Sequence, residues 1–261
     1  MKKFERKLIV VLAAATLLST SVLANEDLPT KTPWKGSYIG FAIGFANGSV
    51  DSDSKLVYNA GYFTDNANGS DAGQVNPLLQ SDLDSTDFIG SLLLGYDFRN
   101  ENLIYGIEAD LTLSQFSESH NVGPIIYDTA PSASFSVSTS VEVDYQINLR
   151  PKIGYATDEF QVYFSAGPSL GRFTTKNIYT DTFRPVDSTI SDTKTVMGLS
   201  SSIGAAYLLA DKWAIRVDYV YSYYSGIVDS STDVDDDGDA DIKYNSDFES
   251  HDIRLAIVKY F

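Results

Sequence analysis

Five aspartates near the C-terminal end of the chain have a spacing that suits a metal ion. The segment from Asp233 to Asp241 reads D-x-D-x-D-G-x-x-D, and calcium prefers clustered carboxylate oxygens around a glycine-permitted turn. An EF-hand would place a glutamate at the twelfth position, where this sequence has Tyr244. The alternative is a solvated acidic surface run without an ion. The predicted calcium ligands, in the last long polar stretch of the chain, are Asp233, Asp235, Asp237, Asp239 and Asp241.

Few residues of the chain suit catalysis. The chain has two histidines and no cysteine, which excludes a cysteine nucleophile, a cysteine zinc site and a disulfide framework. Glu118, Ser119 and His120 are consecutive, and a serine beside a histidine suggests the nucleophile of a hydrolase. Because such proximity is common by chance, we predict no enzyme, no catalytic residue and no cofactor apart from calcium.

The charge of the chain argues against one class of partner. The 261 residues include 19 Lys and Arg against 35 Asp and Glu, a net charge of −16. A chain this acidic repels phosphate backbones, so we expect no nucleic acid partner.

The first residues have the composition of a secretory signal peptide. Lys2, Lys3, Arg6 and Lys7 precede an apolar run over 8–18, and small residues end at Ala24. The run is shorter than the roughly 20 residues that a membrane-spanning helix needs. We therefore predict a signal peptide over 1–24, a short periplasmic segment over 25–36 and a folded domain over 37–261.

Beyond the signal peptide the hydrophobic pattern has a period of two, which is typical of strands with one apolar and one polar face. From Leu103 to Ser114, for example, apolar residues at odd positions alternate with residues such as Glu108 and Asp110. Eight segments follow this pattern, over 37–47, 88–99, 103–114, 141–155, 160–173, 195–210, 213–224 and the last residues up to 261.

The connections between these segments alternate between short and long. Tight polar turns join three pairs of segments, and long polar stretches over 48–86, 115–135, 174–192 and 225–247 join the rest. This alternation is typical of outer-membrane barrels. The predicted fold is therefore all-β, an eight-stranded antiparallel up-and-down transmembrane β-barrel with an N-terminal signal peptide. A soluble β-sandwich would also alternate, but here the polar faces carry ionic residues and the apolar faces carry aromatics near strand ends.

In such a barrel the apolar face meets lipid and the charged face meets the lumen. Eight strands leave an interior just wide enough for side chains, so we expect opposite charges to pair there. A structural polar core and a narrow cation-preferring channel both fit this arrangement. The predicted lumen charge network comprises Glu108, Asp110, Glu142, Asp144, Arg150, Lys152, Arg216, Asp218, Asp252 and Arg254.

Several segments resemble the small outer-membrane β-barrel family of Gram-negative bacteria. This family, labelled outer membrane protein beta-barrel domain or porin family, has an OmpA-like transmembrane barrel and includes alphaproteobacterial surface antigens and hemin-binding proteins. The resemblance is carried by Trp34–Gly44 (WKGSYIGFAIG), Tyr105–Asp110 (YGIEAD), Leu149–Gly167, Gly204–Tyr224 and His251–Phe261. It implies that the terminal Phe261 is the signal for barrel insertion machinery. Lys259 departs from the pattern, because an aromatic or apolar residue is usual there.

The sequence thus predicts a non-enzymatic protein of the cell outer membrane of a Gram-negative bacterium. Four long external loops would give it a structural or surface-interaction role, as an antigen or adhesin. Its expected partners are outer-membrane lipid, the insertion machinery, and a host surface or small molecule at the loops. A narrow ion or small-solute channel is the alternative, and a barrel hydrolase or a hemin-binding protein is a weaker one.

Overall fold

The computed structural model describes residues 34–57, 70–80, 82–183, 186–209, 212–235 and 238–261. The predicted signal peptide and nearly all of the predicted segment 25–36 lie outside these residues. Within them, no helix combines the length and apolar character needed to cross a bilayer.

A closed ring of eight long strands forms the body of the molecule, as predicted. Each strand pairs antiparallel with the next, and β1 closes the ring on β10 from Tyr38↔Tyr260 to Ser52↔Ser246. Closure leaves the lipid-facing part of the ring without a free edge. The ring strands are β1 (Gly36–Ser52), β3 (Leu83–Asn100), β4 (Leu103–Ser114), β6 (Ser134–Ala156), β7 (Phe160–Asp181), β8 (Val186–Leu208), β9 (Trp213–Thr232) and β10 (Ile242–Tyr260).

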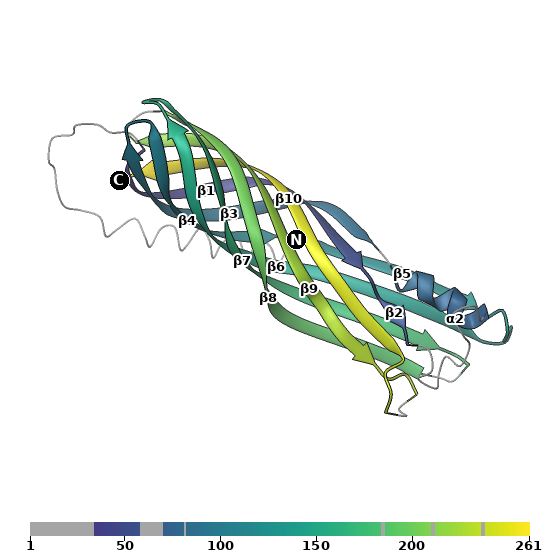
Figure 1. The fold of residues 1–261 in the computed structure, drawn as a ribbon. Helices are drawn as coiled ribbons and strands as arrows, with labels where there is room; N and C mark the ends of the chain where they lie inside the picture. The colour runs from purple at the N-terminus through teal and green to yellow at the C-terminus, as the bar shows by residue number, and fades with distance from the viewer. Residues whose placement is uncertain (1–33, 58–69, 81, 184–185, 210–211, 236–237) are drawn as a thin grey trace.

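An apolar band covers the outside of the ring next to its tight turns. The short connections lie at the end of the barrel that carries the C-terminus, and the opposite end carries the other elements (Figure 1). Beyond the band, the only large exposed hydrophobic side chains among the described residues are Ile126 and Phe183. Members of the band include Ile43, Ile107, Leu149, Ile203, Val217 and Ile257, each at least 42% exposed.

The strands continue well past this band, and here the prediction of long loops was wrong. β7 extends to Asp181 and β8 begins at Val186, so most of the stretch predicted as a loop over 174–192 is paired strand. We call the part of the molecule beyond the apolar band the head. It also contains β2 (Lys55–Leu56), α2 (Ser70–Val75), the 3-10 helix η2 (Asn76–Leu78) and β5 (Ser117–Ile126).

In the head, the ring separates into two sheets. The described pairing of β8 with β9 stops at Leu199↔Tyr223, although β8 remains paired with β7 up to Val186. On the other side, β3 pairs with β4 only as far as Ile89↔Ser114, and β5 then pairs with β6. One sheet therefore contains β5, β6, β7 and β8, and the other contains β9, β10, β1 and β3.

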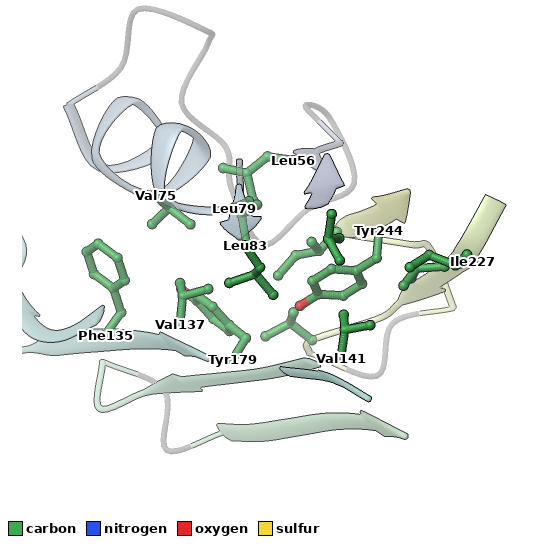
Figure 2. Packing of buried hydrophobic residues seen from close by; sticks show 14 of the residues in the cluster. Leu56, Val75, Leu79, Leu83, Phe135, Val137, Val141, Tyr179, Ile227 and Tyr244 are labelled. Atoms are coloured by element: carbon green, nitrogen blue, oxygen red, sulfur yellow. The ribbon is translucent and has the colours of Figure 1, made fainter. Parts of the chain in front are cut away.

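A hydrophobic core fills the space between these two sheets. Val137, Val141 and Tyr179 come from one sheet, and Ile227 and Tyr244 from the other, all at most 4% exposed. The segment with α2 and η2 closes the core from one side, as Figure 2 shows for Val75 and Leu79, next to Leu83 at the start of β3. The head is thus a small β-sandwich built from the strands of the barrel, with an interior like that of a soluble protein.

Candidate functional site

Below the head, the lumen is filled by charged side chains that pair with one another. Glu108 of β4 lies at the centre of this group and is 1% exposed. Arg216 of β9 donates to both carboxylate oxygens of Glu108, at 2.5 Å and 3.0 Å, and to Asp218 Oδ2 at 2.8 Å. Tyr38 donates to Glu108 Oε2 at 2.7 Å. Such two-pronged guanidinium–carboxylate contacts are the strong form of an ion pair.

A second carboxylate, Asp110, connects two further arginines across the barrel. Arg150 Nη2 lies 2.5 Å from Asp110 Oδ2, and Arg254 Nη1 lies 3.1 Å from Asp110 Oδ1. Arg254 also pairs with Asp252 at 2.5 Å. Four strands that are distant in sequence therefore share one network, because inward positions at this height bring β4, β6, β9 and β10 together.

Lys152 pairs with a carboxylate that the sequence analysis missed. Its Nζ lies 2.7 Å from Asp97 Oδ2, and Tyr260 donates to the same oxygen at 3.0 Å. Asp97 is fully buried, on β3. Extending the alternation along the weaker segment 88–99 would have placed Asp97 on the inward face.

Glu142 and Asp144 were predicted in the lumen, but the structure places them on the outer face. The pairing of β6 with β7 shifts between Val143 and Tyr145, which is a β-bulge. A bulge adds one residue and reverses the facing of the residues beyond it. Val143 is therefore fully buried inside, and Asp144 lies 3.7 Å from the partly exposed Arg172 instead.

An aromatic layer separates the charged lumen from the apolar core of the head. Phe173 lies 5.1 Å from Tyr224 and 5.3 Å from Phe248, and Phe116 lies 5.3 Å from Phe248, as ring centroids. A cavity of about 10 Å³ lies between this layer and the polar side chains below it. That space is at the lower limit for one water molecule. The described side chains therefore close the interior at this height.

The predicted calcium ligands are only partly brought together. Asp233, Asp235 and Asp241 each offer a carboxylate oxygen, and these oxygens lie within 4.8 Å of one another. Asp233 accepts a hydrogen bond from the Gly238 amide and Asp241 accepts one from the Val234 amide, both at 2.7 Å. Asp239 is exposed and outside this group, and Asp237 lies outside the described residues. Calcium binding here stays a prediction.

The geometry does not favour the hydrolase alternative. Ser119 and His120 lie on β5, where they pair with Ser140 and Thr139. Consecutive residues of a strand point to opposite faces, so this serine and histidine do not face each other as a nucleophile and its base would.

A buried polar cluster lies near the tip of the head. Tyr127 donates to Asp181 Oδ2 at 2.5 Å, and Tyr179 lies 3.1 Å from the same oxygen. Burial, together with the bond to Asp181, raises the pKa of Tyr127 well above its usual value. The cluster therefore holds the Tyr127 hydroxyl neutral and fixes β5's end against β7.

The C-terminal residue directly follows the last strand. Phe261 is 42% exposed, and its amide donates to Ser37 O at 2.9 Å. Lys259 Nζ lies 5.2 Å from the centre of the Trp213 ring, at the turn end of the band. The role of Phe261 in insertion stays a prediction.

A family model and two relatives match most of this chain. The family model described as outer membrane protein beta-barrel domain matches residues 10–249, which confirms the resemblance seen in the sequence. The 31 kDa outer-membrane immunogenic protein of Brucella melitensis is 24% identical over 229 residues, 83% of this chain and 86% of the relative. The 22 kDa outer membrane protein of Rhizobium leguminosarum bv. viciae is also 24% identical, over 89% of this chain and 81% of the relative. Among solved structures, Neisserial surface protein A is 13% identical, with a TM-score of 0.33, over 85% of this chain and 97% of that one.

Proposed function

This chain belongs to the outer membrane protein beta-barrel domain family of Gram-negative bacteria, and from that premise we propose that it is a non-enzymatic surface protein whose head is its interaction module. In this proposal the lipid-facing part of the barrel is an anchor. The head projects from the cell, because barrels of this kind have short periplasmic turns and longer external connections.

The observation that carries the proposal is the head's apolar core on top of a closed lumen. External connections that were flexible loops would present no fixed surface. Here, paired strands extend past the membrane band and pack around Val141, Tyr179 and Tyr244. Side chains held on a packed scaffold lose less entropy when a partner binds.

The name of one relative supports exposure at the cell surface. The Brucella relative is named an outer-membrane immunogenic protein. For this chain we infer from that name only that the head is accessible from outside the cell.

Cysteine labelling of intact cells tests this orientation, because the chain has no cysteine of its own. Lys176 is an exposed residue of β7 in the head, and Glu101 is an exposed residue of the turn between β3 and β4. A membrane-impermeant maleimide is expected to label Lys176→Cys on intact cells, and Glu101→Cys only after the outer membrane is permeabilised. Labelling of Glu101→Cys alone on intact cells would overturn the proposal.

A narrow channel is the second candidate, favoured by the charges that line the lumen. Five buried carboxylates face four buried cationic groups there, which would favour cations. We expect the refolded full chain to give no current steps in a planar bilayer, because paired side chains fill the interior. Reproducible steps that change in Arg216→Ala would establish the channel and contradict our reading of the lumen.

A further inference from the structure

The small cavity below the aromatic layer has short side chains on one side and polar ones on the other. Its volume is about 10 Å³, and Phe116 and Phe248 of the aromatic layer cover it. On the β1 side it is lined by Ala46 and Gly48. A Cβ at position 48 would lie 2.7 Å from Phe116 Cδ2, so the aromatic rings need glycine there. The cavity therefore results from small residues of β1 next to closely packed rings.

The polar side chains around this cavity present oxygen atoms to it. Thr112 and Gln146 line it from directly opposite positions on β4 and β6, and Ser250 and Asp252 line it from β10. The Ser250 hydroxyl donates to Asp252 Oδ1 at 2.5 Å. The Thr112 hydroxyl donates to Asp110 Oδ1 at 2.9 Å. Because both hydroxyl protons point to carboxylates, what these groups offer to the cavity is the lone pairs of their oxygens.

Gln146 adds an acceptor that the protein itself does not satisfy. Its side chain is 3% exposed, and its Oε1 is buried with no hydrogen-bond partner among the described residues. A buried amide oxygen without a partner is costly, so its position beside a cavity points to a bound group. A water molecule has only two protons to donate to these acceptors, whereas a hard cation is attracted to every oxygen around it. The lining therefore favours a cation.

The charges of the lumen favour a cation as well, because one negative charge is in excess. Among the described lumen side chains that are at most 3% exposed, five carboxylates face four cationic groups. Lys152 pairs with Asp97, and the remaining four carboxylates alternate with three guanidinium groups in one chain of ion pairs. This chain begins and ends on a carboxylate, in the order Asp252, Arg254, Asp110, Arg150, Glu108, Arg216 and Asp218. Arg99, at the turn end, pairs with the exposed Asp158 and does not change this balance.

The cavity lies at the end of this chain of ion pairs that is nearest the head. Asp252 lines the cavity, whereas Asp218, at the other end, lies closer to the turns and accepts a hydrogen bond from Tyr163. A buried charge in excess is unfavourable unless a counter-charge neutralises it. One positive charge beside Asp252 would balance the lumen. A divalent ion would reverse the imbalance, and calcium takes about six to eight ligands, more than this space can hold.

We propose that this cavity binds one sodium ion, with oxygen ligands from Gln146, Thr112, Ser250 and Asp252. A monovalent cation matches the single charge in excess, and a small one matches a space no larger than a water molecule. The ion would neutralise the lumen and satisfy the Gln146 oxygen directly below the aromatic layer. The proposal depends neither on the orientation of the head nor on its role as an interaction module.

Equilibrium unfolding of the full chain in detergent micelles tests the site. The protein is refolded at each sodium concentration, so that the ion can enter before the barrel closes, and N-methylglucamine replaces sodium at constant total chloride. For one bound ion, the equilibrium constant of unfolding is expected to fall about tenfold for each tenfold rise in sodium above the Kd. An unfolding constant that does not depend on sodium between about 3 mM and about 300 mM would overturn the proposal and leave a water molecule or a proton in this place.

Matched variants separate this site from general effects of sodium. Gln146→Met keeps the size of the side chain and removes the amide oxygen, and Asp252→Asn removes the charge in excess, so both are expected to lose the sodium dependence. Gln161→Met makes the same change in another fully buried amide, which donates to Tyr260 Oη near the turns, and is expected to keep it. If Gln146→Met does not fold, Asp252→Asn decides. Full sodium dependence in either folded cavity variant, or its loss in Gln161→Met, would overturn the proposal.

Discussion

The lumen and the core of the head are enclosed by the same ring of strands, except that β5 replaces β4 in the head, but the two interiors are built from opposite kinds of side chains. In the lumen, Glu108 and Arg216 are buried as an ion pair, whereas in the head Val141 and Phe173 are buried in an apolar core. The outer faces are reversed as well, apolar around the lumen and mainly polar around the head. The change occurs at the aromatic layer.

This difference shows that the surroundings of a strand decide which of its faces carries apolar residues. Where lipid surrounds the wall, apolar side chains are stable outside and polar groups must satisfy one another inside. Where water surrounds it, burial of apolar surface again stabilises the interior. One strand can meet both demands in two ways. Its apolar pattern can change phase, as in β7, where Leu170 faces outward and Phe173 inward, or a bulge can exchange its faces, as in β6 beside Asp144.

The largest expected loss of stability comes from a substitution in the lumen charge network. Glu108→Ala leaves Arg216 without the carboxylate that holds both of its terminal nitrogens, and breaking a buried pair costs about 3–5 kcal/mol. Denaturant unfolding in lipid vesicles measures this loss of unfolding free energy. Glu142→Ala is the matched control, and because Glu142 lies on the outer face it should change stability by less than about 0.5 kcal/mol. Equal losses would contradict the outward placement of Glu142.

The next largest loss of stability is expected from a substitution in the apolar core of the head. Leu79 is 2% exposed and packs under the α2 segment, so Leu79→Ala should cost about 2–5 kcal/mol of head stability. Limited proteolysis of folded protein in vesicles measures the opening of the head. Ile126→Ala is the control, because Ile126 is 61% exposed. Equal protection of Leu79→Ala and the wild type would show that the core does not hold the head together.

The strands of the membrane band are easier to predict from the sequence than the strands of the head. The alternation in 103–114 identified the membrane strands, since lipid and lumen impose a strict period of two. In 186–195 (VDSTISDTKT) short polar residues dominate, so the same period is hidden and the segment resembles a loop. The bulge at Asp144 gave no local signal, because Val141, Val143 and Tyr145 continue one apolar alternation that crosses from the inside to the outside.

Alkaline pH is expected to destabilise the head, because the buried Tyr244 must ionise. Burial raises the pKa of Tyr244 above its usual value, so its contribution is complete below about pH 10 and is lost as the pH rises further. The loss is at most about 1.4 kcal/mol for each pH unit above 10. Head proteolysis between pH 9 and 11.5 should therefore be less pH-dependent in Tyr244→Phe. Identical profiles for the two proteins would remove Tyr244 from this account.

Calcium is expected to have the smallest effect, in the head alone. Binding at Asp233, Asp235 and Asp241 would add about 0.4 kcal/mol when the calcium concentration equals its Kd. Thermal unfolding with millimolar calcium or magnesium, on the wild type and on Asp235→Asn, measures this. A shift of equal size in the variant would assign the effect to general screening.

Hydrogen exchange of the protein in nanodiscs tests most directly whether the aromatic layer divides the barrel into two separately stabilised regions. Leu79→Ala should speed exchange in head segments such as 135–143 and 224–232 and leave 104–113 as protected as in the wild type. Glu108→Ala should show the reverse. Faster exchange across both regions in either variant would contradict the account, because it would mean that lumen and head open as one unit.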